Sequence, residues 1–187
     1  QPVFDAYPDR CFDPGMAEQH AAGLAVGMAM GGKKPVLVYQ SSFMQRAFDQ
    51  FFHDICFMGL PVLIVTVRTS LAGYDNPTHH GIYDASYLRC LPGLYMFHAH
   101  GEQHTRNLLR GNLQYLKFPV LIATPHGKIP EFDCPSQSEG WGGKNVLLLP
   151  VGNQVPAAYE IAHKLKGVAV HHLLQLKPIP PEYIHHW

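Results

Sequence analysis

Short apolar runs alternate with helical stretches along most of this chain, and this alternation most constrains the fold that the chain can adopt. A parallel strand that is buried on both faces of a sheet reads as a short, continuous apolar run. Such runs lie at residues 36–39, 62–67, 94–98, 120–124, 146–151 and 168–176. Helical patterns lie between them at residues 17–30, 45–57, 102–116 and 155–165. The spacing predicts an α/β fold built on a doubly wound parallel sheet.

The same pattern divides the chain into two units. Residues 1–130 predict a first domain, although residues 1–12 show no clear strand and helix ahead of the first helical pattern. Residues 131–144 are rich in Pro, Gly and Ser, which is typical of an interdomain linker. Residues 145–187 predict β-α-β, and about 40 residues are too few to bury a core alone. We therefore expect this piece to pack on the first domain, on a continuation of itself, or on another chain.

Composition excludes several classes of protein. The 14 Lys and Arg residues balance the 14 Asp and Glu residues, which argues against binding nucleic acid or an anionic membrane through bulk charge. The four cysteines are widely spaced and form no C-x-x-C pair, so a reducing cytoplasm is favoured over a disulfide or zinc scaffold. The sequence begins with Gln1 and ends at Trp187, which indicates a processed, trimmed or split polypeptide.

The thirteen histidines give no metal-binding pattern. The H-E-x-x-H motif is absent, and two close pairs, His98 with His100 and His171 with His172, lie on or beside predicted strands. Successive side chains of a strand point to opposite faces, so we expect these imidazoles to scatter. No metal ligand is predicted in this chain.

Glu18 stands out among the acidic residues because a loop containing Pro14 and Gly15 delivers it to the start of an apolar helix. An acidic residue in the first helical turn stabilises the helix dipole, and this is its structural explanation. The functional alternative is a carboxyl group that is held at the edge of a sheet beside a ligand.

The stretch from Arg10 to His20, R-C-F-D-P-G-M-A-E-Q-H, resembles the 1-deoxy-D-xylulose-5-phosphate synthase family of transketolase-like thiamine-diphosphate enzymes. Further stretches match the family in order, at residues 42–50, 53–54, 60–63, 78–79 and 84–90. The resemblance implies that residues 1–130 form a pyrimidine-binding domain that lacks its usual N-terminal strand and helix. Residues 145–187 would then open the family's C-terminal domain.

The resemblance implies that Glu18 activates the cofactor. In the family the matching Glu hydrogen-bonds N1′ of the aminopyrimidine and favours the tautomer whose N4′ can take the proton from thiazolium C2. Phe43 and Arg46 match residues around the pyrimidine ring, on which an aromatic side chain can stack. Their structural alternatives are core packing for Phe43 and a surface or interface ion pair for Arg46.

The resemblance also implies a substrate site in and beside the long loop at residues 69–92. Arg68, Asp75 and His79 match family residues that contact the substrates. His79 is expected to be catalytic, either by donating to a developing alkoxide or by shuttling a proton. The structural alternatives are an ion pair for Arg68 and a hydrogen-bonded loop histidine for His79.

Two departures from the family concern the acceptor. The family's R-Y-P-R-G motif reads A-T-P-H-G here, and Ala123 cannot make the charge-assisted contacts of an arginine. The tyrosine of the family's I-Y-S-T-F stretch is replaced by Gln40, which we place in the substrate site. These changes predict a different acceptor, for which an unphosphorylated aldehyde is one candidate. A paralogue that has lost its function is the alternative.

The family's G-D-G…N signature, which binds Mg²⁺ and the diphosphate of the cofactor, has no match in this sequence. Thiamine diphosphate and Mg²⁺ are therefore expected to need a companion chain or segment, in a cytoplasmic dimer or other homo- or hetero-oligomer. The predicted activity is a transferase that joins a two-carbon unit from a 2-oxo acid such as pyruvate to an aldehyde, as in isoprenoid biosynthesis. Two alternatives stay open: a non-catalytic scaffolding or regulatory subunit, and an E1β-like component of a 2-oxo-acid dehydrogenase.

Overall fold

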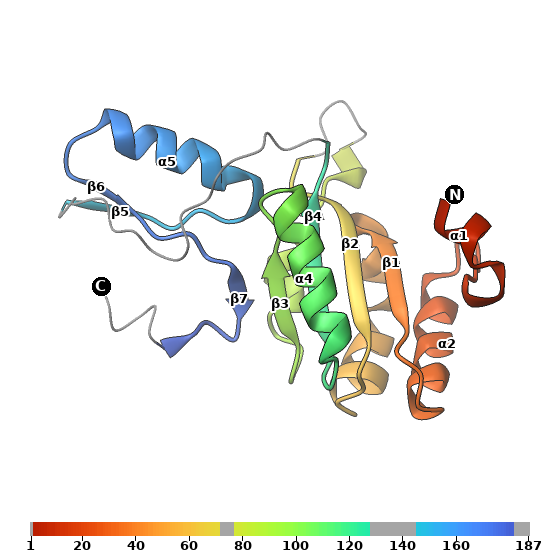
Figure 1. Ribbon diagram of the computed structural model, residues 1–187. Helices are drawn as coiled ribbons and strands as arrows, with labels where there is room; N and C mark the ends of the chain where they lie inside the picture. The colour runs from red at the N-terminus through yellow and green to blue at the C-terminus, as the bar shows by residue number, and fades with distance from the viewer. Residues whose placement is uncertain (1, 72–76, 128–144, 182–187) are drawn as a thin grey trace.

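The computed structural model describes residues 2–71, 77–127 and 145–181 of the 187-residue chain, and a five-stranded sheet lies at its centre (Figure 1). The strands β1 (Val36–Gln40), β2 (Leu63–Thr69), β4 (Val120–Pro125) and β3 (Tyr95–His98) lie in this order and pair in parallel. The strand β7 (Gln175–Lys177) adds to β3 in the antiparallel direction. The predicted α/β fold with a parallel sheet is confirmed.

Helices cover both faces of the sheet, and the side chains of β2 alternate between the two apolar clusters that these helices cover. Val62 and Ile64 of the β2 segment pack on the face that carries α2 (Glu18–Met30). Leu63 and Val65 face the opposite way, toward α4 (Glu102–Gln114). A period of two along a strand produces this division, and burying each of these side chains contributes about 1.5–3 kcal/mol.

The helix expected at residues 45–57 forms in a different way. A 3₁₀ helix, η2 (Ser41–Ala47), follows β1 without a connecting loop, and a π-helix, η3 (Gln50–Cys56), comes next. Both lie on the α2 face, where Met44 and Phe51 are completely buried. An apolar pattern at helical spacing does not distinguish these winding types, and π-helical turns are frequent near functional sites. Among the described residues ahead of α2, the chain forms a short helix, α1 (Pro2–Ala6), and a 3₁₀ turn, η1 (Pro8–Arg10), neither of which has buried residues.

The C-terminal unit is a small β-α-β arrangement. Strands β5 (Val146–Leu148) and β6 (Val168–Val170) pair in parallel, and they are joined by η5 (Gly152–Gln154) and α5 (Val155–Lys164). Val155, Tyr159 and Val170 are buried between α5 and this small sheet.

The single strand predicted at residues 168–176 is wrong, because the chain leaves β6 and crosses to the main sheet before it forms β7 (Figure 1). The main-chain N–H of His98 donates to the carbonyl of Leu174 at 3.3 Å, and Lys177 Nζ donates to the carbonyls of Arg89 and Leu91. The C-terminal unit therefore packs on the first domain, one of the three arrangements expected from the sequence. Within the described residues, none of the helices combines the length and the apolar character that crossing a membrane requires.

Candidate functional site

Glu18 is the first residue of α2, and it is only 7% exposed. The loop before it turns at Gly15, which has a φ of +69° and whose N–H donates to Asp13 Oδ1 at 2.9 Å. The main-chain oxygen of Glu18 accepts a hydrogen bond from Tyr39 Oη at 2.8 Å. The structure thus places Glu18 at the N-terminal end of its helix, beside the end of β1.

Arg46 provides the cation beside this carboxylate. Its Nη1 lies 3.3 Å from Glu18 Oε2, and the Arg46 side chain is 55% exposed while that of Glu18 is 8% exposed. Solvent around the exposed guanidinium screens this ion pair and limits its contribution to stability. The pairing fits the structural alternative for Arg46, and it also leaves the guanidinium accessible to a ligand that approaches Glu18.

Phe43 and His79 meet on the same side of the sheet. Their ring centroids are 5.3 Å apart at an interplanar angle of 69°, in an edge-to-face arrangement. Phe43 belongs to η2 and His79 ends the 3₁₀ turn η4 (Pro77–His79), and both are half-buried. Thr78 Oγ1 lies 3.0 Å from His79 Nδ1. We call Glu18, Phe43, Arg46 and His79 together the Glu18 edge.

The backbone under the Glu18 edge is fixed by a close approach that the sequence did not reveal. Ser41 Oγ donates to Asp84 Oδ2, and both residues are buried. Gly81 lies so close that a Cβ there would overlap Ser41 Oγ and would lie 2.9 Å from the carbonyl oxygen of Arg68. Ser70 and Gly81 exchange two main-chain hydrogen bonds of 2.9 Å. These contacts lock the end of β1 to the loop that follows β2.

Asp84 begins α3 (Asp84–Leu88) and is 2% exposed, and burial raises the pKa of its carboxyl group above the ordinary value. The hydrogen bond from Ser41 acts in the opposite direction. Asp84 lies in a stretch that resembles the family, so the sequence resemblance could have marked it as a candidate site residue. Its hydrogen bond to Ser41 could not be predicted, because that contact depends on tertiary structure.

The residues predicted for the substrate site are partly brought together. Arg68 has a φ of 63°, in the left-handed region that side chains other than glycine rarely adopt, and its Nε donates to His126 Nδ1 at 3.3 Å. Gln40 is half-buried at the end of β1, and within the described parts of the chain its Nε2 has no hydrogen-bond partner. Ala123 is completely buried in the cluster on the α2 face. Asp75 lies outside the described residues.

A cavity of about 220 Å³ lies at the carboxyl ends of β2, β3 and β4, next to η5. Thr69, Ser70, His98 and Gly152 are among the residues that line it. The four residues of the Glu18 edge are not in its lining. The Glu18 edge is therefore not part of this cavity, which belongs to the contact between the main sheet and the C-terminal unit.

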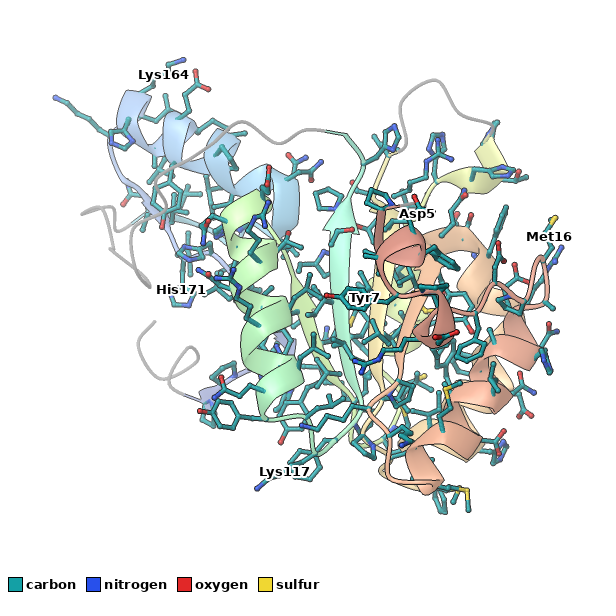
Figure 2. The ribbon with its side chains drawn as sticks, turned by 45° about the vertical axis from the view of Figure 1, so that its right-hand side comes forward. Asp5, Tyr7, Met16, Lys117, Lys164 and His171 are labelled. Carbon is teal, nitrogen blue, oxygen red and sulfur yellow. The ribbon has the colours of Figure 1, made fainter. Side chains whose placement is uncertain are left out.

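Histidines from separate segments gather beside that contact, where one member of each close pair, His100 and His172, joins His104. The rings of His100 and His104 stack with centroids 4.0 Å apart, and His172 lies edge-on to His100 at 5.9 Å. Tyr159 Oη lies 2.9 Å from His172 Nδ1. We call these four residues the histidine junction. The four-residue spacing of His100 and His104, around the start of α4, was the available sequence signal for this cluster. His172 lies in the chain after β6, next to His171, which Figure 2 labels.

Burial keeps the junction uncharged at neutral pH. It lowers the pKa of His104 and of His172 to about 4, and the neighbouring imidazoles add to the shift. Burial also lowers the pKa of His98 to about 4 and lowers that of His100. Within the described residues, no group of three or more His, Cys, Asp or Glu side chains could hold a metal ion.

Comparison with known proteins decides the family. Residues 2–131 match the family described as transketolase, pyrimidine binding domain. The chain belongs to this family. The resemblance seen in the sequence is therefore confirmed, and the parallel sheet with helices on both faces is the pyrimidine-binding type of α/β domain.

Curated relatives refine this placement. The chain is 40% identical over 192 residues to a 1-deoxy-D-xylulose-5-phosphate synthase from Chlorobaculum tepidum, a match that covers 96% of this chain and 30% of the relative. It is 38% identical over 199 residues to the synthase from Desulfotalea psychrophila, with 98% and 31% covered. The chain thus spans about a third of the length of these relatives.

A solved structure described as a split gene transketolase, inactive β4 tetramer, matches 97% of this chain with a TM-score of 0.82. The sequence identity is 26%, and the match covers 62% of that structure. The similarity extends past the pyrimidine-binding domain and includes most of the C-terminal unit.

Proposed function

We propose that this chain forms the pyrimidine-binding side of a thiamine-diphosphate-dependent transketolase-like transferase. The observation that carries the proposal is Glu18, which is 7% exposed and pairs with Arg46 of η2, the element whose Phe43 contacts His79. The proposed reaction joins a two-carbon unit from a 2-oxo acid such as pyruvate to an aldehyde. The many synthases among the relatives support this assignment.

The described residues fit the aminopyrimidine end of the cofactor. Glu18 offers a buried carboxylate that can hydrogen-bond a ring nitrogen, and Phe43 offers a half-buried aromatic face. Bound thiamine diphosphate supplies the carbanion chemistry, and the protein positions and tunes it. In this proposal Glu18 holds the proton at N1′, Phe43 and Arg46 flank the ring, and His79 donates a proton to the substrate oxygen.

The proposal places the ligands for Mg²⁺ and for the diphosphate on a companion chain or segment. The G-D-G…N signature has no match in this sequence. Phe12 and Met16, in the loop just ahead of Glu18, are 58% and 75% exposed, and Figure 2 shows Met16 projecting from the edge of the molecule. Large apolar side chains exposed beside the site favour an additional protein surface there. The similar split transketolase, whose tetramer is described as inactive, supports a requirement for another subunit.

The acceptor in this proposal is an unphosphorylated aldehyde. Ala123, at the position of the family's first arginine, is buried in the core and offers no charge. His126, later in the same A-T-P-H-G stretch, accepts a hydrogen bond from Arg68 through Nδ1, so this nitrogen offers no proton to a phosphate group. This loss of positive charge favours an acceptor without a phosphate group.

Calorimetry and kinetics on the chain mixed with its companion test the proposal. We expect thiamine diphosphate with Mg²⁺ to bind the mixture, and we expect Glu18→Gln to lower kcat by about 10²–10⁴-fold, the range for a lost proton-transfer group. Glu102→Gln is the matched control, because Glu102 is an exposed carboxylate paired with Arg106 on α4. Near-normal turnover by Glu18→Gln, or no cofactor binding by the mixture, would contradict the proposal.

A further inference from the structure

The hydroxyl group of Tyr39 ties β1 to the first residue of α2. Tyr39 Oη donates to the main-chain oxygen of Glu18 at 2.8 Å, and the two residues are 6% and 7% exposed. The ring of Tyr39 is held edge-on against Phe51, with centroids 5.7 Å apart at 79°. Burial, with the Glu18 charge as a second cause, raises the pKa of the Tyr39 phenol above its ordinary value. The hydroxyl group therefore stays protonated and keeps the hydrogen that it donates to the main-chain oxygen of Glu18.

The local sequence gives the start of α2 little other support. Ala17 occupies the N-cap position and provides no side-chain hydrogen bond, whereas Ser, Thr, Asp or Asn would cap the first turn. The φ of Gly15 is +69°, so the loop ahead of Ala17 turns through a conformation that glycine favours. The hydrogen bond from Tyr39 thus adds a tertiary restraint to a helical turn without a side-chain cap.

Tyr39 also connects Glu18 to the other residues of the Glu18 edge. The strand β1 runs directly into η2, which carries Phe43 and Arg46. A restraint between Tyr39 and Glu18 therefore fixes the carboxylate against the same segment that presents the aromatic ring and the guanidinium. Displacements of about 1 Å at such sites can lower turnover by about 100-fold.

We propose that Tyr39 is a positioning residue that sets the place of the Glu18 carboxylate relative to Phe43 and Arg46. The expected effect on turnover rests on the proposed function. The Tyr39–Glu18 hydrogen bond itself lies within this chain and does not depend on that function. Tyr39 touches no reacting group in this arrangement and acts through the backbone of Glu18.

Tyr87 offers a closely matched control. Its ring lies edge-on to Phe48 with centroids 5.9 Å apart at 68°, and burial raises the pKa of its phenol as well. Within the described residues, the buried Tyr87 hydroxyl group has no hydrogen-bond partner. Replacing either tyrosine with phenylalanine keeps the ring and removes a buried hydroxyl, but only Tyr39→Phe removes a bond to Glu18.

The first test is carboxyl ¹³C NMR on the full chain, with the Glu18 signal assigned by its loss in Glu18→Gln. We expect Tyr39→Phe to shift or broaden the Glu18 signal and Tyr87→Phe to leave it in place. The second test is steady-state kinetics on the chain assembled with its companion. We expect Tyr39→Phe to lower kcat by about two- to tenfold, the range for one hydrogen bond, with KM unchanged.

Three results would overturn the proposal: an unchanged Glu18 signal in Tyr39→Phe, an equal change in both tyrosine variants, or a Tyr39→Phe effect confined to KM. The NMR result stands even where the proposed function fails, because it needs no cofactor. Conversely, full turnover by Glu18→Gln would reject the function and leave the Tyr39 restraint to be judged by NMR alone. Far-UV circular dichroism confirms that each variant is folded, and Tyr39→Met supplies a second variant without the hydroxyl group.

Discussion

The Glu18 edge and the histidine junction both join distant segments of the chain, but they treat charge in opposite ways. At the Glu18 edge a buried carboxylate lies against Arg46, whose side chain is 55% exposed. At the histidine junction, burial lowers the pKa of His104 and His172 to about 4, so that the stacked imidazoles are neutral near pH 7. A charged, half-open edge suits a site that binds a ligand, whereas an uncharged stack suits a permanent contact.

The two regions also differ in what fixes them. The Glu18 edge depends on backbone contacts that leave no room for a side chain at Gly81. The junction depends on ring contacts among His100, His104, His172 and Tyr159, which belong to α4, to α5 and to the chains next to β3 and β6. We therefore expect the junction to respond most to pH and the Glu18 edge to respond most to steric change.

Acidification should give the largest difference between the two regions, because it should destabilise the histidine junction. The folded-state pKa of His172 is about 4, against an ordinary value of 6.5, so the fold favours its neutral form. The stability that His172 contributes is complete above pH 6.5 and is lost as the pH falls from 6.5 toward 4. Because His172 is only 3% exposed, the loss from this residue alone is on the order of 3 kcal/mol. Urea unfolding at a series of pH values measures it.

The double variant His104→Gln with His172→Gln should flatten this pH dependence between pH 6.5 and 4. His53→Gln is the control, since His53 is 61% exposed and pairs with Asp49 on a segment, η3 and its N-cap, that contributes no residue to the junction. Within the described residues, His171 is a further titratable group that acts on His172, and the Tyr159 hydroxyl group lies 2.9 Å from His172 Nδ1 inside the junction. If the free energy of unfolding of the double variant keeps the same pH dependence, groups other than His104 and His172 cause the loss of stability in acid. The proposed difference in pH sensitivity between the two regions would then be wrong.

Gly81→Ala should damage the Glu18 edge and leave the junction intact. A Cβ at Gly81 would overlap Ser41 Oγ and lie 2.9 Å from the carbonyl of Arg68, and overpacking of this kind costs about 1–3 kcal/mol. Gly111→Ala is a control of opposite sign, because Gly111 lies within α4 with no atom near its would-be Cβ. We expect that control to gain about 0.5–1 kcal/mol. Thermal unfolding of both variants gives the comparison, and equal stability would mean that the loop moves freely.

The elements that the sequence predicted best are those whose burial is decided by local pattern. The four parallel strands of the main sheet are continuous apolar runs, and α2 and α4 show helical spacing of apolar residues. The run at residues 168–176 was misread because apolarity says that a segment is buried but not in which sheet. The winding of η2 and η3 was missed for a related reason, since 3₁₀, α and π turns share similar spacings.

The candidate site shows the same limit. Glu18, Phe43, Arg46 and His79 were found through resemblance, and the structure brings them together as two pairs, Glu18 with Arg46 and Phe43 with His79, which are linked through η2. The restraints that hold them were not found, because the bond from Tyr39 to Glu18 joins residues 21 positions apart. The bond from Ser41 to Asp84 spans 43 positions. Contacts at such separations depend on how the strands are ordered, which no local pattern encodes.

Arg46→Gln should change the free energy of unfolding least among these variants. It also distinguishes a structural role from a ligand-binding role for this residue. The pair with Glu18 spans 3.3 Å and one member is largely in solvent, so its removal should change the free energy of unfolding by less than about 1 kcal/mol. Arg106→Gln, which breaks the exposed pair with Glu102 on α4, should cost a similar amount. If Arg46 serves the cofactor, only Arg46→Gln will weaken the binding of thiamine diphosphate to the assembled protein. A large loss of stability with unchanged binding would instead show that Arg46 acts as a structural partner of the buried carboxylate.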